Sequence, residues 1–153
     1  MIKLNLIIIA LVIGSFSSAQ YNVITSNELT INGTQFFGED VSVVIQHLGQ
    51  PNTIEDYYFE IDDVMSQNYN YNGVLFTVIS NRTYSFEITG SNYAFTSNNI
   101  KVGDNINTLQ PIYPLSYANR SHNSLVIQFS DLDRYVLIFF NSNQITEIRL
   151  ESY

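Results

Sequence analysis

The feature that most constrains the fold of this chain is an alternation of apolar and polar residues with a period of two. Over residues 83–89, the apolar residues Tyr84, Phe86 and Ile88 alternate with polar side chains. Successive side chains of a β-strand point to opposite faces of the sheet, so this pattern is typical of a strand with one buried face and one face in water. The sequence therefore predicts antiparallel strands that cover one side of a core.

Four more segments are predicted to be strands, and short turn-forming segments separate them. The predicted turn Ser80-Asn81-Arg82 joins residues 68–79 to residues 83–89 as a hairpin. Residues 130–133 and 141–144 separate the last three predicted strands in the same way. These strands are predicted to form a second antiparallel meander, at residues 125–129, 135–140 and 145–150.

Residues 40–48 carry the clearest helical pattern. Asp40 precedes the first turn, and Gly49 followed by Pro51 comes after the last, which are typical start and stop signals of a helix. One stripe at helical spacing holds the apolar residues, namely Val41, Val44, Ile45 and Leu48. We expect this stripe to pack on the sheet.

A short match at an offset of 65 residues indicates an internal repeat. Residues 37–41 (FGEDV) recur as residues 102–106 (VGDNI), and each copy precedes a helical turn and then strands. Pro111 and Pro114 would cut the second helix to little more than one turn. The pattern predicts an α+β fold of tandem helix-plus-antiparallel-sheet repeats, at about residues 34–96 and 97–153, within a single mature domain of residues 20–153. The alternative is a mostly-β single sandwich with one helix.

The same segments carry a resemblance to a known fold. Gly38-Glu39-Asp40-Val41, then Leu48-Gly49-Gln50-Pro51 and then Tyr69-Asn70-Tyr71 resemble the G-x-x-x-x-V…LG-x-P…Y-x-Y pattern of the beta-lactamase-inhibitory-protein-like fold, which small outer-membrane assembly lipoproteins share. The resemblance implies a helical hairpin on a small antiparallel sheet, with two such units in tandem in the inhibitory proteins. This chain lacks the disulfides that the inhibitors usually carry, so the resemblance extends to the fold and not to inhibition.

The first 19 residues have the layout of a secretory signal peptide. Lys3 supplies a positive charge, residues 6–13 form an unbroken apolar run, and Ser17-Ser18-Ala19 ends in small residues before Gln20. The apolar run is far shorter than the roughly 18 to 20 residues that span a bilayer, and no later segment approaches that length. We therefore expect cleavage after Ala19 and an exported protein, secreted or periplasmic, with no integral membrane segment.

Composition restricts the class of protein. Apolar residues make up 45% of the chain and charged residues 13%, which is far from the composition of disordered proteins. The chain has no cysteine, so packing alone must stabilise an exported protein, and redox chemistry and thiolate metal sites are excluded. The net charge of −8, which becomes −9 if Lys3 is removed with the signal peptide, repels phosphate backbones. Nucleic acid is therefore not an expected partner.

No catalytic residue, metal site or cofactor is predicted from the sequence. His47 and His122 lack a second ligand at metal-binding spacing, and Ser91 lacks the G-x-S-x-G context of a nucleophile elbow. Asp131 and Asp133 lack the rest of a calcium-binding loop. Carboxylates that could form an acid–base pair lie in a segment predicted to be a solvated acidic loop, and they are Glu55, Asp56, Glu60, Asp62 and Asp63.

Aromatic residues are the unusual part of the composition, with 11 tyrosines, 10 phenylalanines and no tryptophan. A tyrosine combines a rigid apolar ring with a polar tip, which suits a binding surface as well as the border of a core. Six tyrosines in predicted loops or strand edges are the candidate binding residues: Tyr57, Tyr58, Tyr69, Tyr71, Tyr113 and Tyr117. The sequence favours a non-catalytic module that binds another protein through an aromatic, acidic face. The alternative is a small extracellular carbohydrate-binding or hydrolytic protein that uses tyrosines as sugar platforms and Glu55, Asp56 or Asp62 as acids.

Overall fold

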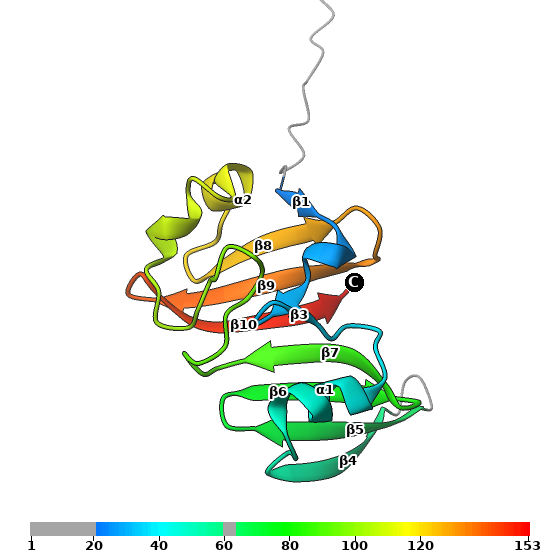
Figure 1. Ribbon diagram of the computed structural model, residues 1–153. Coiled ribbons are helices and arrows are strands. Elements are labelled where there is room, and N and C mark those ends of the chain that lie inside the picture. The colour runs from blue at the N-terminus through cyan, green and yellow to red at the C-terminus, as the bar shows by residue number, and fades with distance from the viewer. Residues whose placement is uncertain (1–20, 60–63) are drawn as a thin grey trace, which may run out of the picture.

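The computed structural model describes residues 21–59 and 64–153, and most strands of this part lie in one large mixed sheet (Figure 1). The sheet has eight strands in the order β1-β8-β9-β10-β7-β6-β5-β4. Its strands are β1 (Val23–Ile24), β4 (Thr53–Phe59), β5 (Val64–Tyr71), β6 (Val74–Ile79), β7 (Arg82–Ile88), β8 (Ser124–Phe129), β9 (Arg134–Asn141) and β10 (Gln144–Ser152). β1 runs parallel to β8, and every other neighbouring pair is antiparallel. A separate two-stranded ribbon consists of β2 (Thr30–Ile31) and β3 (Thr34–Gln35).

The helices lie on one side of this sheet. α1 (Val41–Leu48) crosses the half made by β4 to β7, and α2 (Pro114–Ala118) lies with its flanking loops against the other half (Figure 1). Two short 3-10 helices, η1 (Ser26–Glu28) and η2 (Ile106–Leu109), complete the helical elements of the described residues. The predicted helix is confirmed, because Asp40 accepts a hydrogen bond from the backbone N–H of Ser42 at 2.9 Å and Gly49 follows the last turn at φ 81°.

A single apolar core lies between the sheet and these covering segments. Side chains from both halves of the sheet contribute to it, and the largest fully buried ones are Phe36, Phe76, Phe95, Leu29, Ile31, Ile88, Ile106, Leu109, Leu125, Ile127, Ile138 and Ile145. In β8, Leu125, Ile127 and Phe129 are buried and alternate with partly exposed residues. The period-two pattern thus places one face of each strand in the core.

The prediction of tandem helix-plus-sheet repeats is wrong. β7 and β10 pair directly, with Ile148 opposite Ile88 and Arg149 opposite Glu87, so the two predicted units share one sheet and the chain is mostly β. Each meander alone would leave an edge strand with unpaired backbone groups, and joining the two edges satisfies them. The alternative sandwich is not observed either, because the second sheet of the described residues has only two strands.

The short sequence match still corresponds to a shared local structure. Gly38 donates a hydrogen bond to the backbone oxygen of Thr83 at 2.8 Å, and Gly103 donates to that of Ile145 at the same distance. Both glycines have positive φ, which glycine adopts without strain. Beyond these glycines the two copies diverge, since the first begins an eight-residue α-helix and the second begins the 3-10 helix η2. The match therefore marks two similar contacts with hairpin strands and not two equal units.

The hairpin turns are of the kind that the sequence indicates. Ser80-Asn81 connects β6 to β7 and Ser142-Asn143 connects β9 to β10, with positive φ at all four residues. Two-residue turns of this conformation match the right-handed twist of paired strands. The predicted strand over residues 68–79 is in fact two strands, because Asn72-Gly73 forms another tight turn between β5 and β6.

Asp131, in the turn between β8 and β9, forms hydrogen bonds with Ser26 at the start of η1. Its carboxylate accepts hydrogen bonds from the backbone N–H of Ser26 at 3.0 Å and from the Ser26 hydroxyl at 2.6 Å. These bonds lower the pKa of Asp131, so the folded protein favours the charged form more than the unfolded chain does. The resulting stabilisation is present above the pKa of the unfolded chain and is lost as the pH falls through the lower folded pKa.

We therefore expect Asp131→Asn to be less stable than the wild type at about pH 7, with a gap that narrows as the pH falls below the ordinary aspartate pKa of about 4. Urea unfolding monitored by circular dichroism at several pH values measures this gap. Asp133→Asn, in the same turn but without a bond to Ser26, is the matched control and should show no such convergence. A gap for Asp131→Asn that stays constant with pH would contradict the expectation.

Candidate functional site

The side of the sheet that faces away from α1 and α2 is the candidate site, and we call it the open face. In the described part of the chain, the helices lie on the opposite side (Figure 1). Strand alternation and register place many side chains on this face, and they include Asn68, Leu75, Thr77, Ile79, Ser85, Glu87, Val126, Gln128, Tyr135, Leu137, Phe139, Glu147, Arg149 and Glu151. The open face thus combines apolar and charged groups, whereas the core face is largely apolar.

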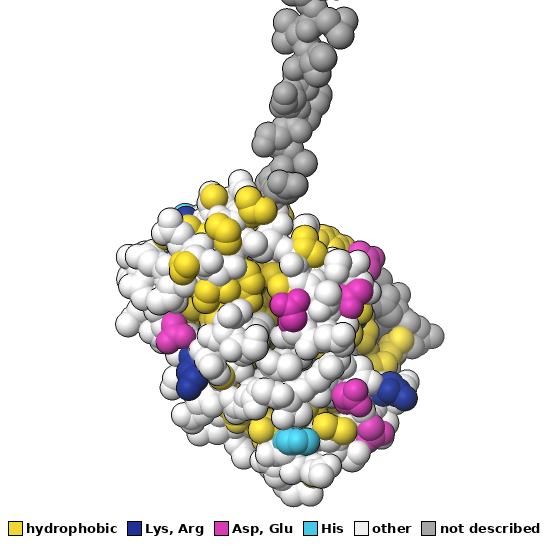
Figure 2. Space-filling model, turned by 45° about the horizontal axis from the view of Figure 1, so that its top comes forward, with side chains coloured by type: hydrophobic (Ala, Val, Ile, Leu, Met, Phe, Trp, Pro, Cys, Tyr) yellow, Lys and Arg dark blue, Asp and Glu magenta, His cyan; other side chains and the backbone are white. Residues whose placement is uncertain are grey.

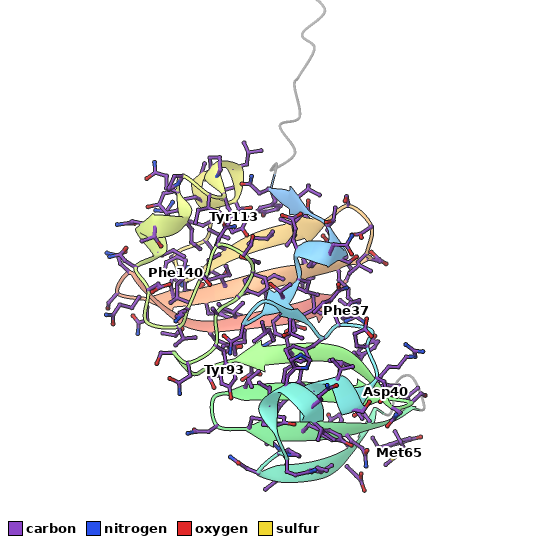
Figure 3. The ribbon with its side chains drawn as sticks, viewed as in Figure 1. Phe37, Asp40, Met65, Tyr93, Tyr113 and Phe140 are labelled. Atoms are coloured by element: carbon purple, nitrogen blue, oxygen red, sulfur yellow. The ribbon has the colours of Figure 1, made fainter. Side chains whose placement is uncertain are left out.

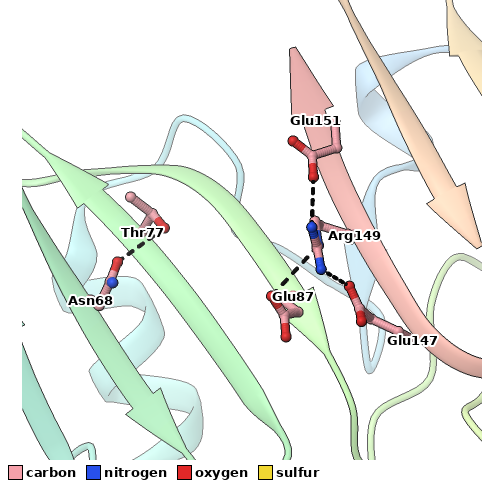
Figure 4. A network of polar contacts seen from close by, with 6 residues as sticks. All are labelled: Asn68, Thr77, Glu87, Glu147, Arg149 and Glu151. Carbon is pink, nitrogen blue, oxygen red and sulfur yellow. Dashed lines mark hydrogen bonds and ion pairs between the residues drawn. The ribbon is translucent and has the colours of Figure 1, made fainter. Parts of the chain in front are cut away.

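A charged cluster lies in the middle of the open face, where β7 meets β10 (Figure 4). Arg149 forms ion pairs with three glutamates, at 3.5 Å to Glu87, at 3.1 Å to Glu151 and also with Glu147. The guanidinium carbon of Arg149 also lies 5.5 Å from the centre of the Phe139 ring. Alternation along β10 brings residues 147, 149 and 151 to the same side, and strand pairing adds Glu87 from β7.

The charged cluster carries surplus negative charge, because three carboxylates surround one guanidinium group. Burial raises the pKa of Glu87, and the nearby charges of Glu147 and Glu151 raise it further, against the opposing effect of Arg149. Each of these side chains keeps between a fifth and two fifths of its surface exposed. A cation brought by a ligand would therefore meet attraction here that Arg149 alone does not neutralise.

The two flanks of the charged cluster differ in character. On the β5–β6 side, the Thr77 hydroxyl donates to the amide oxygen of Asn68 at 3.2 Å (Figure 4), and this polar pair lies between the partly exposed Leu75 and Ile79. On the β8–β9 side, Val126, Leu137 and Phe139 are partly exposed and make the flank apolar. The open face therefore has a mixed flank on β5 and β6, the charged cluster in the middle, and an apolar corner on β8 and β9.

A hollow of about 340 Å³ occupies this apolar corner, and we call it the tyrosine pocket. Tyr21 precedes β1, Tyr135 lies on β9, and Tyr153 follows β10. The remaining lining residues, Val126, Gln128 and Leu137, come from β8 and β9. The register of β1 on β8 and of β9 on β10 brings these three distant parts of the sequence together.

The six tyrosines predicted as binding residues are spread over several surroundings. Tyr69 is 8% exposed and Tyr113 is 5% exposed, and burial raises the pKa of Tyr113, which lies beside α2 (Figure 3). The Tyr71 hydroxyl donates to the backbone oxygen of Gly49 at 3.0 Å, close to the end of α1. Tyr117 donates to the side-chain oxygen of Asn107 at 2.6 Å. These four belong to the core or to helix contacts.

Tyr57 and Tyr58 are exposed neighbours on the edge strand β4. Consecutive residues of a strand point to opposite faces, so the two rings do not share a surface. Tyr57 pairs with Ser66 and Tyr58 pairs with Met65 on β5. The structure therefore does not gather the six predicted tyrosines into one patch.

The carboxylates considered for acid–base chemistry are placed differently from the prediction. Glu55 and Asp56 lie on β4 and not in a loop, and as consecutive strand residues they point to opposite sides of the sheet. Asp56 accepts a hydrogen bond from the Gln67 amide at 3.0 Å. The other three, Glu60, Asp62 and Asp63, lie outside the described residues. The described pair thus does not face a common cleft.

The histidines and other possible metal ligands also lie apart. A ring nitrogen of His47 is 2.9 Å from the backbone oxygen of Val43, and the ring packs edge-on against Phe36. Within residues 21–59 and 64–153, three or more His, Asp or Glu side chains do not come together in a geometry that could hold a metal ion. A helix of membrane-spanning length and apolarity is likewise not found in those two ranges.

Sequence reasoning missed most residues of the open face, although Glu55 and Tyr57 lie on that side of β4 through their pairing with Asn68 and Ser66. The E-x-R-x-E spacing of residues 147–151 was an available signal, since it places three charged side chains on one side of a strand. Glu87 could not be added to them, because its pairing with Arg149 joins residues far apart in the sequence. The tyrosine pocket depends in the same way on contacts between the two ends of the chain.

The fold and the open face define the chain as a mostly-β protein with one mixed sheet that helices cover on a single side. No protein-family model matches the sequence, and no curated protein is significantly similar to it. In fold it is similar to a solved extracellular protein containing an SCP domain from Bacillus anthracis str. Ames, with a TM-score of 0.55 and 12% identity over 76% of this chain. The matched region spans 44% of that protein, so the similarity describes the fold of one part of it. The resemblance to the inhibitory-protein-like fold stays a prediction.

Proposed function

We propose that the chain is an exported, non-catalytic protein-binding module that binds its partner on the open face. The observation that carries the proposal is the mixed character of this face, where partly exposed Leu137 and Phe139 lie beside the charged cluster on the side away from the helices. Partly exposed apolar side chains gain further burial on docking, and the charges around them select the partner.

The charge of the open face indicates the chemistry of the partner. Glu87, Glu147 and Glu151 outnumber Arg149, and the chain as a whole has a net charge of −8. On the side shown in Figure 2, too, acidic side chains are scattered and basic ones are few. Burial and the charges of Glu147 and Glu151 raise the pKa of Glu87, and a protein that presents lysine or arginine side chains among apolar ones would offset the repulsion from these charges. The proposed partner is therefore a basic protein surface.

Two observations support export. Residues 1–19 have the layout of a signal peptide, and the structurally similar Bacillus anthracis protein is described as extracellular. The absence of cysteine requires that packing alone stabilise the exported protein, and the continuous core through both halves of the sheet supplies that packing.

The proposal is tested by capturing partners from the secreted and envelope proteins of the producing cell and titrating the purified partner with defined variants. The double variant Glu87→Gln, Glu151→Gln removes the surplus negative charge and leaves Arg149 paired with Glu147. We expect it to weaken binding by roughly tenfold and to reduce the dependence of the affinity on salt.

The matched control is Glu39→Gln, Asp133→Asn, which removes the same amount of charge from positions outside the open face. It should bind the partner as tightly as the wild type does. If both double variants bind equally well, the partner uses another surface. If the captured partner is acidic and insensitive to salt, the proposed basic chemistry is wrong.

A further inference from the structure

We propose that the tyrosine pocket is a binding site for a neutral sugar ring. This inference goes beyond the proposed function, because the pocket lies at the apolar corner of the open face and its ligand is a small molecule. The pocket is lined by Tyr21, Tyr135 and Tyr153 around Val126, Leu137 and Gln128. Three tyrosines from three separate segments meet there, although the chain has only 11 in all.

The rings of Tyr135 and Tyr153 form an angled aromatic surface in the tyrosine pocket. The ring centres of Tyr135 and Tyr153 lie 4.9 Å apart and their planes are inclined by 49°, so the two rings make an open angle and do not stack flat. Val126 and Leu137 supply an apolar floor from adjacent strands, where they are register partners. The C–H face of a sugar ring packs well on such an aromatic surface, because the C–H groups meet the electron-rich faces of the rings.

A hydrogen bond between two lining residues orients polar groups of the tyrosine pocket. The side-chain amide of Gln128 donates a hydrogen bond to the Tyr153 hydroxyl at 2.9 Å, which orients both groups. The amide oxygen of Gln128 can then accept a hydrogen bond, and the Tyr153 hydroxyl can donate one to a ligand. This pairing of an apolar platform with neutral donors and acceptors matches a sugar, which has an apolar ring face and hydroxyls around its edge.

Charge and size restrict the ligand further. The side chains of the six lining residues are all uncharged, so they provide no counter-ion for a charged ligand. The hollow of about 340 Å³ is at the small end of ligand pockets, which suits one or two rings of a longer saccharide. The neighbouring charged cluster is negative, which disfavours acidic sugars in particular.

The test uses the whole exported chain and three neutral disaccharides, namely cellobiose, maltose and N,N′-diacetylchitobiose. Tyrosine fluorescence reports binding directly because the chain has no tryptophan, and saturation-transfer NMR provides an independent readout. We expect at least one disaccharide to bind with a dissociation constant on the order of 1 mM, and Tyr153→Ala to weaken this binding by about tenfold. Tyr153→Phe keeps the ring and should lose less affinity.

Tyr57→Ala is the matched control, since it removes another exposed tyrosine at the far edge strand β4, and it should leave sugar binding unchanged. Tyr153 is 72% exposed at the end of the chain, so Tyr153→Ala should keep the wild-type circular dichroism spectrum. Absence of binding to all three disaccharides at about 10 mM would overturn the proposal. Binding that Tyr153→Ala does not weaken would overturn it as well, and neither result depends on the protein partner of the open face.

Discussion

Replacing Phe76 by alanine is expected to lower the free energy of unfolding by about 3 to 5 kcal/mol. Phe76 is fully buried on β6, where its ring packs edge-on against Phe36 at 5.3 Å and against Tyr71 at 6.1 Å. Truncation removes the aromatic contacts and leaves a cavity that rigid strands on both sides cannot close. Because a domain of this size is stable by only about 5 to 15 kcal/mol, the loss is a large fraction of the total.

Urea unfolding at neutral pH measures this loss. Leu75→Ala is the matched control, because Leu75 is the preceding residue on the same strand and lies on the open face, where it is only partly buried. We expect a loss of less than about 2 kcal/mol there. Equal losses at the two positions would show that both sides of the sheet are covered in solution, which would contradict the open face on which the proposed function depends.

The second large effect is expected at Gly73 and Gly90, where two backbone segments are in direct contact. Gly73 accepts hydrogen bonds through its backbone oxygen from the N–H groups of Thr89 at 2.9 Å and Gly90 at 2.8 Å. A Cβ atom added to Gly73 would lie 2.6 Å from the Cα of Gly90, and one added to Gly90 would lie 2.8 Å from the Cα of Gly73. Neither glycine can gain a side chain unless the turn between β5 and β6 moves away from the end of β7.

We expect Gly73→Ala to cost about 2 to 4 kcal/mol of stability and Gly90→Ala about 1 to 3 kcal/mol. The difference arises because Gly73 also has φ +93°, a conformation that alanine adopts only with strain, whereas Gly90 has no such requirement. Denaturant unfolding of both variants gives the two values.

Gly33→Ala separates the two causes. Gly33 has φ +78° but no heavy atom within 4 Å of an added Cβ, so this variant reports the strain of positive φ alone. Its cost should be about 1 kcal/mol. A loss at Gly90 no larger than the loss at Gly33 would mean that the contact between the two segments is loose.

Local features of the sequence predicted local features of the structure well. The start at Asp40 and the end at Gly49 fix the bounds of α1, because they satisfy the backbone groups that a helix leaves unpaired. The Ser-Asn pairs at residues 80–81 and 142–143 mark the hairpin turns, since both positions require positive φ. Each of these features depends on a few neighbouring residues, which is why the sequence alone was sufficient.

The acidic segment shows where such reasoning fails. Thr53–Phe59 has too few large apolar residues in alternation to indicate a strand, yet it forms β4 by pairing with β5 along its length. An edge strand needs only one hydrogen-bonded neighbour and can be exposed on both faces, so its side chains carry little signal. The burial of Tyr69 and Tyr113 was also not predicted. Both belong to the core cluster, and this burial depends on segments that are distant in the sequence.

The sequence by itself determined that residues 83–89, 125–129, 135–140 and 145–150 are extended, that the chain turns at residues 80–81 and 142–143, and where α1 begins and ends. It also determined the surplus of acidic residues and the absence of disulfides. Only the tertiary structure decided that β7 pairs with β10, that one side of the joined sheet stays open, and that Tyr21, Tyr135 and Tyr153 meet. The physical reason is that every edge strand offers the same row of backbone donors and acceptors. The choice among edges therefore depends on how the whole core packs and not on a local pattern.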